Sequence, residues 1–141
     1  MNQLQVFRFL VVTATVCYVM WFFLPFWSDY LTDIEYRAAS YSGYGSLLPI
    51  QHPLYYGTWF ALSLIAALGL FLMKNWARHL YLVLSILGLA SVPFSGFVIQ
   101  PPLDTLFSSA NQLLDGAVLA MAYLSPLADN FRLISKKRRT I

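Results

Sequence analysis

Apolar residues are gathered in four long stretches of the chain, which are separated by more polar segments. The stretches cover approximately residues 8–27, 55–73, 79–99 and 103–127. A helix needs about 20 apolar residues to cross a hydrocarbon core of about 30 Å, so each stretch is long enough to span a membrane. The segments between the last three stretches are only a few residues long, and such short connections make neighbouring helices antiparallel. The pattern predicts an all-α integral membrane bundle of four transmembrane helices in an up-down-up-down arrangement.

The composition agrees with this pattern. Hydrophobic residues make up 59% of the chain and charged residues only 11%, whereas charged residues make up about 25% of an ordinary soluble domain. A chain of 141 residues has too small an interior to bury so much apolar surface, so lipid must cover much of it. We therefore expect a single membrane domain over residues 1–141. The first stretch is too long for a removable signal peptide and lacks its cleavage pattern, so we expect it to be retained.

The basic residues are distributed unequally between the two predicted sides of the membrane. The side that would hold both termini carries Arg8, Lys74, Arg78, Arg132, Lys136, Lys137, Arg138 and Arg139, and the opposite side carries only Arg37. Because cytoplasmic segments are enriched in Lys and Arg, the N- and C-termini are expected to be cytoplasmic. The basic tail 128–141 then anchors this topology; contact of its four consecutive basic residues with anionic lipid is an alternative. The net charge of +3 thus reflects membrane orientation, and no nucleic-acid partner is expected.

Residues 28–54 form the longest polar segment, and they would lie in the first outer loop. Thr32 and Glu35 have the spacing of a capping box at a helix start, and Gly43 would end that helix. We therefore expect a short amphipathic helix in this loop. The loop also gathers the candidate partner-binding residues, which are Asp33, Glu35, Tyr36, Tyr41 and Tyr44. Two interpretations stay open: a lid at the level of the lipid headgroups, where tyrosines commonly lie, or a recognition surface for a partner.

Asp115 is the most distinctive polar feature, because it lies at the centre of the fourth apolar stretch. A charged Asp at the membrane centre costs roughly 2.5–3.5 kcal/mol on insertion scales, so it should face the bundle interior. The candidate intramembrane polar site contains Asp115, Asn111 and Ser108 on one face of the fourth helix, and Ser85, Ser91 and Ser95 on the third. We expect these hydroxyl and amide groups to hydrogen-bond the carboxyl group. We favour structural hydrogen bonding as its role, with a proton or cation relay or a polar-substrate site as the alternative.

Small residues and a proline predict where the helices pack and bend. Gly57 with Ala61, and the pair 116 and 120, have the four-residue spacing that lets helix backbones approach each other. Pro93 removes a backbone hydrogen bond inside the third stretch, so it predicts a kink there.

The chain lacks the residue patterns of familiar catalytic and cofactor sites. His52 and His79 would lie on opposite sides of the membrane, so they cannot bind one metal ion or haem together. Cys17 has no second Cys or His at ligand spacing, and we expect it to pack as a small hydrophobic residue. No P-loop, nucleophile-elbow or dinucleotide-binding glycine pattern is present. We therefore expect no enzyme activity, no cofactor and no metal site.

Four short motifs resemble those of small four-span bacterial inner-membrane proteins. They are Gly43-Tyr44-Gly45, Trp76-Ala77-Arg78, Leu114-Asp115-Gly116 and Ser125-Pro126-Leu127. That family has no settled biochemical role, so the resemblance implies a bacterial cytoplasmic membrane and nothing about activity. In size and layout the chain is also similar to the four-span immunity proteins of pore-forming bacteriocins.

These observations favour a non-catalytic inner-membrane protein that acts by protein–protein interaction. It would be an accessory subunit of a membrane complex or an immunity-type protective partner. The expected partners are the lipid bilayer and either other membrane protein subunits or further copies of the chain. The alternative is a small oligomeric transporter or proton-coupled conduit that uses Asp115.

Overall fold

The computed structural model describes residues 2–24, 32, 34, 37, 41–48, 52–127 and 131. In this part of the chain the regular structure is helical, and there is no strand. The helices are α1 (Gln3–Phe23), α3 (Pro53–Phe71), α4 (Asn75–Ser91), the short 3₁₀ helix η3 (Val92–Phe94) and α5 (Pro102–Leu124). The prediction of an all-α fold is confirmed for the described residues.

In the described part of the chain, three helical segments are long and apolar enough to cross a membrane, namely α1, α3, and α4 together with η3. These segments identify the chain as a membrane protein. The fourth predicted span, α5, is not among them, although it contains 23 residues. Its polar residues Asn111, Gln112 and Asp115 lower the mean hydropathy of its central part.

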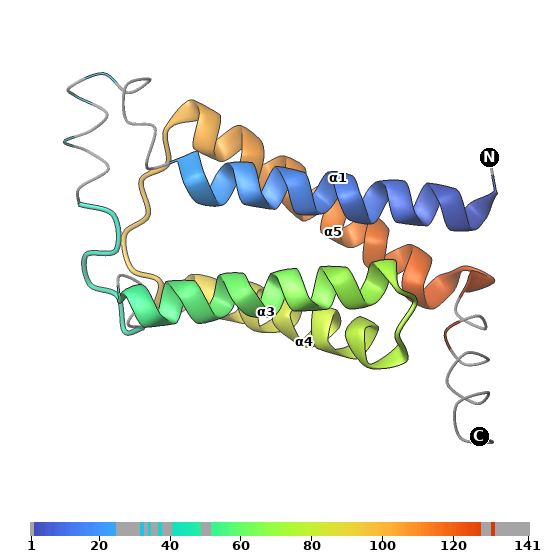
Figure 1. Cartoon of the computed structure of the whole chain (residues 1–141). Coiled ribbons are helices and arrows are strands. Elements are labelled where there is room, and N and C mark those ends of the chain that lie inside the picture. Colours follow the sequence, from blue (N-terminus) through green and yellow to red (C-terminus); the bar gives the residue numbers. More distant parts are fainter. Residues whose placement is uncertain are drawn as a thin grey trace.

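The helices form two neighbouring pairs, α1 beside α5 and α3 beside α4 (Figure 1). In addition, α1 packs on α3, whereas α4 and α5 contact each other only lightly. Successive helices run in opposite directions (Figure 1). We call the end that holds the start of α1, the α3–α4 turn and the end of α5 the core end. The opposite end, which holds the α1–α3 loop and the α4–α5 connection, is the loop end.

Local sequence accounts for where α3 begins and ends. His52 precedes the helix, and its Nδ1 accepts a hydrogen bond from the backbone N–H of Leu54 at 3.3 Å. Pro53 occupies the first helical position, where a missing N–H removes no intrahelical bond. At the other end Met73 adopts a φ of 55°. This left-handed conformation ends the helix and turns the chain into α4.

The third apolar stretch is not helical to residue 99 as predicted. α4 ends at Ser91, η3 ends at Phe94, and residues 95–101 contain no helix. Pro93 explains this end, because it has no N–H to donate and its ring clashes with the preceding helical turn. Gly96 then adopts a φ of 73°, a conformation that glycine tolerates far better than other residues. The proline therefore marks a helix end here and not a kink within a continuous span.

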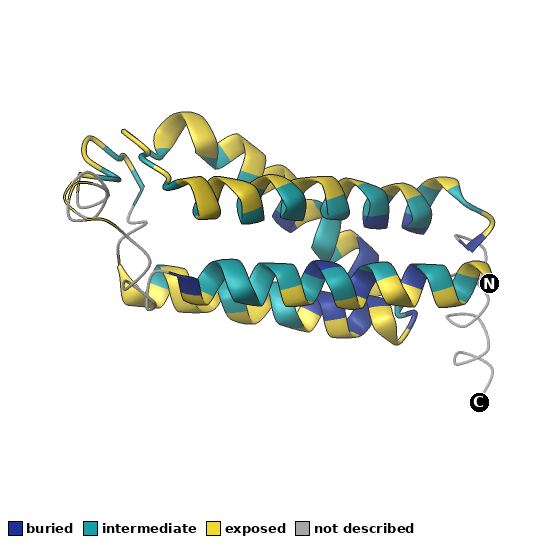
Figure 2. Cartoon of the chain, turned by 90° about the horizontal axis from the view of Figure 1, so that it is seen from above, coloured by how far each residue is buried: buried dark blue, intermediate teal, exposed yellow. Residues whose placement is uncertain are grey.

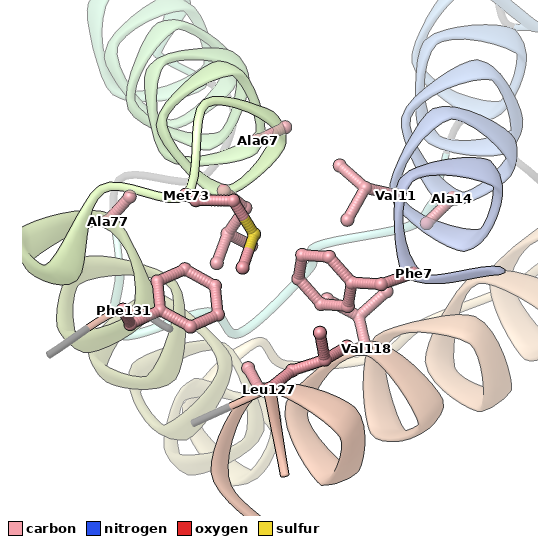
Figure 3. Packing of buried hydrophobic residues seen from close by; sticks show 11 residues of the cluster. Phe7, Val11, Ala14, Ala67, Met73, Ala77, Val118, Leu127 and Phe131 are labelled. Atoms are coloured by element: carbon pink, nitrogen blue, oxygen red, sulfur yellow. The ribbon is translucent and has the colours of Figure 1, made fainter. Parts of the chain in front are cut away.

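The buried hydrophobic residues gather toward the core end (Figure 2). Their cluster contains Phe7, Val11, Ala14, Ala67, Leu70, Met73, Ala77, Val118, Ala122, Leu127 and Phe131. Figure 3 shows the rings of Phe7 and Phe131 close together within this cluster. Both are fully buried, and their ring centroids are 5.9 Å apart in an edge-to-face arrangement. Aromatic pairs favour this geometry, so the two rings hold the start of α1 to the segment that follows α5.

The α1–α3 loop is attached to the α4–α5 connection, a contact that the sequence did not predict. Tyr44 and Phe97 form an antiparallel β-bridge. The N–H of Phe97 donates to the carbonyl oxygen of Tyr44 at 3.0 Å. The N–H of Gly43 donates to the carbonyl oxygen of Phe97 at 2.7 Å. A Cβ at Gly96 would lie only 2.6 Å from the carbonyl oxygen of Tyr44. Glycine at this position therefore permits the close approach of the two segments.

The short amphipathic helix predicted in the same loop falls mostly outside the described residues. Asp33, Glu35 and Tyr36 lie outside them, as do Lys136, Lys137, Arg138 and Arg139 of the basic tail. The roles expected for these residues therefore stay predictions.

α3 and α4 approach each other closely beside Gly69. A Cβ at this position would collide with the Cβ of Ala77 and would lie 3.0 Å from the ring of Trp76. By contrast, a Cβ at Gly57 or at Gly116 would meet no neighbouring atom within 4 Å. Among the described residues, the two small-residue pairs that begin at these glycines therefore do not mark close helix contacts, contrary to the prediction. The spacing of small residues along a helix does not by itself show which glycine faces a neighbouring helix.

Replacing Gly69 with Ala should destabilise the protein by about 1–3 kcal/mol, the usual cost of overpacking a close contact. The matched control is Gly57→Ala in the same helix, which should be neutral or stabilising by up to about 1 kcal/mol because alanine favours the helix. Unfolding of the detergent-solubilised variants, followed by far-UV circular dichroism, measures the difference. Equal stability of the two variants would contradict the close packing at Gly69.

Candidate functional site

A cavity of about 440 Å³ lies between the four long helices, on the loop-end side of the hydrophobic core. Most of its wall is apolar. The polar side chains that line it are Thr15 and Tyr18 of α1, Ser63 of α3, Tyr81 and Ser85 of α4, and Asn111, Gln112 and Asp115 of α5. A concave, mostly apolar cavity with a few polar groups is typical of a site for a small ligand.

Asp115 carries the strongest polar interactions in the cavity. The hydroxyl of Tyr81 donates a hydrogen bond to its Oδ1, and the amide Nδ2 of Asn111 donates to its Oδ2 at 3.3 Å. Asn111 lies one turn earlier on α5, whereas Tyr81 belongs to α4, so the Tyr81 bond joins two helices. No Lys, Arg or His lines the cavity among the described residues. The described partners of the carboxyl group are thus neutral hydrogen-bond donors.

The serines of the predicted site do not bond Asp115. Their hydroxyls donate to backbone carbonyls three or four residues earlier in the chain: Ser85 to Tyr81 at 2.9 Å, Ser91 to Gly88 at 2.7 Å, Ser95 to Ser91 at 2.9 Å and Ser108 to Thr105 at 3.1 Å. Serine hydroxyls in helices commonly bond the carbonyl three or four residues earlier. Of these serines, Ser85 lines the cavity, and Ser91 lines a smaller neighbouring one. The structure therefore brings together Asp115, Asn111 and Ser85, and it adds Tyr81.

Aromatic side chains of α1 and α3 form much of the cavity wall toward the loop end, and sequence reasoning missed them. Tyr18, Trp21 and Trp59 line the cavity. The same three residues also line an adjacent cavity of about 220 Å³, together with further aromatic residues of the same two helices. The signal in the sequence is the recurrence of aromatic residues at 18, 21 and 22 and at 56, 59 and 60. Spacings of three and four residues place them on one helix face.

Arg78 is buried, whereas the sequence predicted only that it lies on the cytoplasmic side of the membrane. Its side chain is only 6% exposed, and its guanidinium lies over the rings of Tyr123 and Phe131, 5.2 and 5.7 Å from their centroids. Cation–π contacts of this kind are stabilising, and more so when they are desolvated. Arg78 therefore connects the start of α4 to the end of α5 and to the core.

The histidines and the cysteine lie far from one another. His52 caps α3 at the loop end, and His79 lies toward the core end with its Nδ1 3.2 Å from the hydroxyl of Tyr123. The Sγ of Cys17 lies 3.7 Å from the carbonyl oxygen of Phe107. Within the described part of the chain, no three His, Cys, Asp or Glu residues come together as a metal site requires.

A second candidate surface lies at the loop end, where two of the predicted partner-binding residues are described. Tyr41 and Tyr44 are 66% and 81% exposed. The bridge between Tyr44 and Phe97 places them beside exposed apolar residues of the α4–α5 connection. We call this surface the loop platform; it consists of Tyr41, Tyr44, Leu47, Phe94 and Phe97.

No protein-family model, curated protein or solved structure matches this chain. The resemblance to small bacterial inner-membrane proteins therefore depends on the four short motifs alone. The cavity and the loop platform are therefore the features of the chain that indicate a function.

Tyr81→Phe and Asp115→Ala should affect stability non-additively, because the two side chains share one hydrogen bond. We expect a coupling of about 0.6–1.7 kcal/mol, the range of interhelical hydrogen bonds in membranes. A double-mutant cycle on unfolding in detergent measures it. The matched control combines Tyr81→Phe with Ser108→Ala, which should be additive because Ser108 bonds within α5. Additive effects in the first cycle as well would mean that the Tyr81–Asp115 bond does not stabilise the fold.

Proposed function

We propose that the chain is a four-span protein of the bacterial cytoplasmic membrane with both termini in the cytoplasm. The two faces of α5 support a fourth span, since its polar residues line the cavity while leucines face outward. The exposed leucines are Leu103, Leu106, Leu113 and Leu124. The positions of Arg8, Lys74 and Arg78 support the orientation, because all three belong to the core end and cytoplasmic segments are enriched in basic residues.

We further propose that the protein is non-catalytic and acts as a small transporter or conduit, with the cavity beside Asp115 as its binding site. The observation that carries this proposal is the cavity itself. The cavity is half open, and its volume of about 440 Å³ falls within the range of roughly 300–1,000 Å³ that is usual for small-molecule sites. Structural hydrogen bonding between helices needs no such space.

The surroundings of Asp115 support binding of a proton or a small ligand. Tyr81 and Asn111 both donate to the carboxyl group, so it keeps two hydrogen bonds when it is ionised. Acidic residues that face an intramembrane cavity commonly mark ion or substrate pathways. The hydrophobic core closes the bundle at the core end of the cavity, so we propose that the complete conduit forms between copies of the chain.

Asp115→Asn should abolish proton-coupled flux, because the amide keeps the hydrogen bond to Tyr81 but does not exchange a proton. The experiment reconstitutes the protein in liposomes, imposes a pH gradient and follows the internal pH with an enclosed dye. The matched control is Ser108→Ala on the same helix, whose hydroxyl bonds within α5 outside the cavity wall, so this variant should keep the flux. Unchanged flux in Asp115→Asn would reject the role of the cavity in transport.

The second candidate function is the one that the sequence favoured, an accessory subunit or protective partner that acts by protein–protein interaction. The loop platform supports it. Hydrogen bonds to the α4–α5 connection hold this part of the loop, and its aromatic residues are exposed. A held aromatic surface loses little conformational entropy when a partner binds.

Replacing both Tyr41 and Tyr44 with Ala should weaken recovery of a partner by at least about tenfold, equivalent to 1.4 kcal/mol. The measurement is gentle extraction of the tagged protein from its own membrane, followed by mass spectrometry of intact complexes. The control pair Leu113→Ala and Leu124→Ala removes equally exposed side chains from the outer face of α5 and should not change recovery. Full recovery by the tyrosine variant would exclude the loop platform as the docking surface.

A further inference from the structure

We propose that the cavity beside Asp115 binds a monovalent organic cation with apolar substituents, such as an aryl- or alkyl-substituted ammonium ion. This inference rests on the proposed function and narrows it to one class of ligand. Three properties of the cavity carry it: the sign of its charge, its aromatic wall and its single charged oxygen ligand.

The cavity complements a single positive charge. Asp115 is the one acidic residue among the residues that line it, and none of the lining residues is basic. A carboxylate in the interior of a membrane protein is costly unless it is paired, and a bound cation supplies the missing charge. An anion would be repelled by the carboxylate, and a doubly charged ion would leave one charge uncompensated.

The aromatic wall favours a cation with an apolar body. Tyr18, Trp21, Trp59 and Tyr81 place four rings around the same space. The faces of such rings attract cations, with Trp the most effective, and this is how aromatic sites recognise quaternary ammonium groups. The remaining wall is mostly apolar, so it would cover alkyl or aryl substituents that a hydrated inorganic ion lacks.

The charge of the cavity does not suit calcium or magnesium. Both ions are divalent and take six or more oxygen ligands, whereas Asp115 is the one charged side chain among the described residues that line the cavity. The other side-chain oxygen atoms belong to neutral hydroxyl and amide groups, and the Oδ1 of Asn111 has no hydrogen-bond partner among the described residues. A single carboxylate beside a mostly apolar wall suits a monovalent organic cation better than a divalent metal ion.

The adjacent smaller cavity suggests how such a ligand would reach Asp115. It shares Tyr18, Trp21 and Trp59 with the main cavity, and it extends toward the loop end along Tyr55 and Tyr56. Aromatic residues therefore line both cavities, from the loop end to the neighbourhood of the acid. A cation that moves along them would keep contact with aromatic rings until it meets the carboxylate.

The test measures binding of benzyltrimethylammonium to the full-length protein in detergent by isothermal titration calorimetry. The comparison ligand is neopentylbenzene, which has the same shape but carbon in place of the charged nitrogen. We expect Asp115→Asn to weaken binding of the cation by at least about tenfold and to leave binding of neopentylbenzene unchanged. Comparison between protein variants also removes the contribution of partition into the micelles.

Two further variants keep the result interpretable. Trp59→Leu preserves an apolar wall but removes a ring, so it should weaken binding of the cation several-fold more than binding of neopentylbenzene. Ser108→Ala, whose hydroxyl bonds within α5 and which does not line the cavity, should change neither. Equal affinity of the wild type for both ligands, no binding of the cation, or unchanged binding of the cation by Asp115→Asn would each overturn the proposal.

The proton-flux experiment distinguishes this inference from the proposed function. Flux that depends on Asp115 in a protein that does not bind the cation would reject the ligand class and keep the transport function. Cation binding that depends on Asp115 in a protein without flux would support the ligand class and reject transport.

Discussion

The hydrogen bond from Tyr81 to Asp115 is the interaction on which the arrangement of the cavity depends. The helices are organised as two pairs, and α4 contacts α5 only lightly, so this bond adds to a small set of contacts between them, such as those of Arg78 and His79 with Tyr123. A tyrosine is long enough to reach an acid on another helix while the two backbones stay apart. A serine would have to bring the backbones together, and little space would then remain beside the carboxyl group.

The two ends of the bundle differ in packing. At the core end, Phe7 packs on Phe131, Gly69 allows α4 to approach α3, and Arg78 lies over two aromatic rings. Close packing of this kind fixes the relative positions of the helices. Toward the loop end the helices are lined with aromatic rings and leave the cavity between them. Close packing at the core end thus holds the four helices together, so the bundle does not need side chains that fill the cavity.

The two proposed functions use different parts of the molecule. Transport would use the cavity beside Asp115, whereas partner binding would use the loop platform formed by Tyr44, Phe97 and their neighbours. One segment connects them, because α4 lines the cavity with Ser85 and Gly88 and then leads through η3 to Phe97. The bridge between Tyr44 and Phe97 therefore attaches the loop platform to the segment that follows α4.

The sequence by itself determined the helical class, the approximate positions of the helices and the place of Asp115 within the last of them. These properties depend on consecutive residues, since runs of apolar side chains and helical periodicity are local. The end of α4 also has a local signal, because Pro93 and Gly96 both disfavour a continuing helix. Pro93 taken alone predicts only a kink. The aromatic wall had one too, because aromatic residues recur at helical spacing in α1 and α3.

Only the tertiary structure decided which side chain meets Asp115 and whether space remains beside it. Ser85 and Tyr81 lie one turn apart on the same helix, so periodicity alone does not choose between them. The serine hydroxyl bonds a carbonyl of its own helix, whereas the tyrosine hydroxyl extends too far to do so and reaches α5. That outcome depends on the distance between two helices, which is set by packing at the core end, among residues distant in sequence.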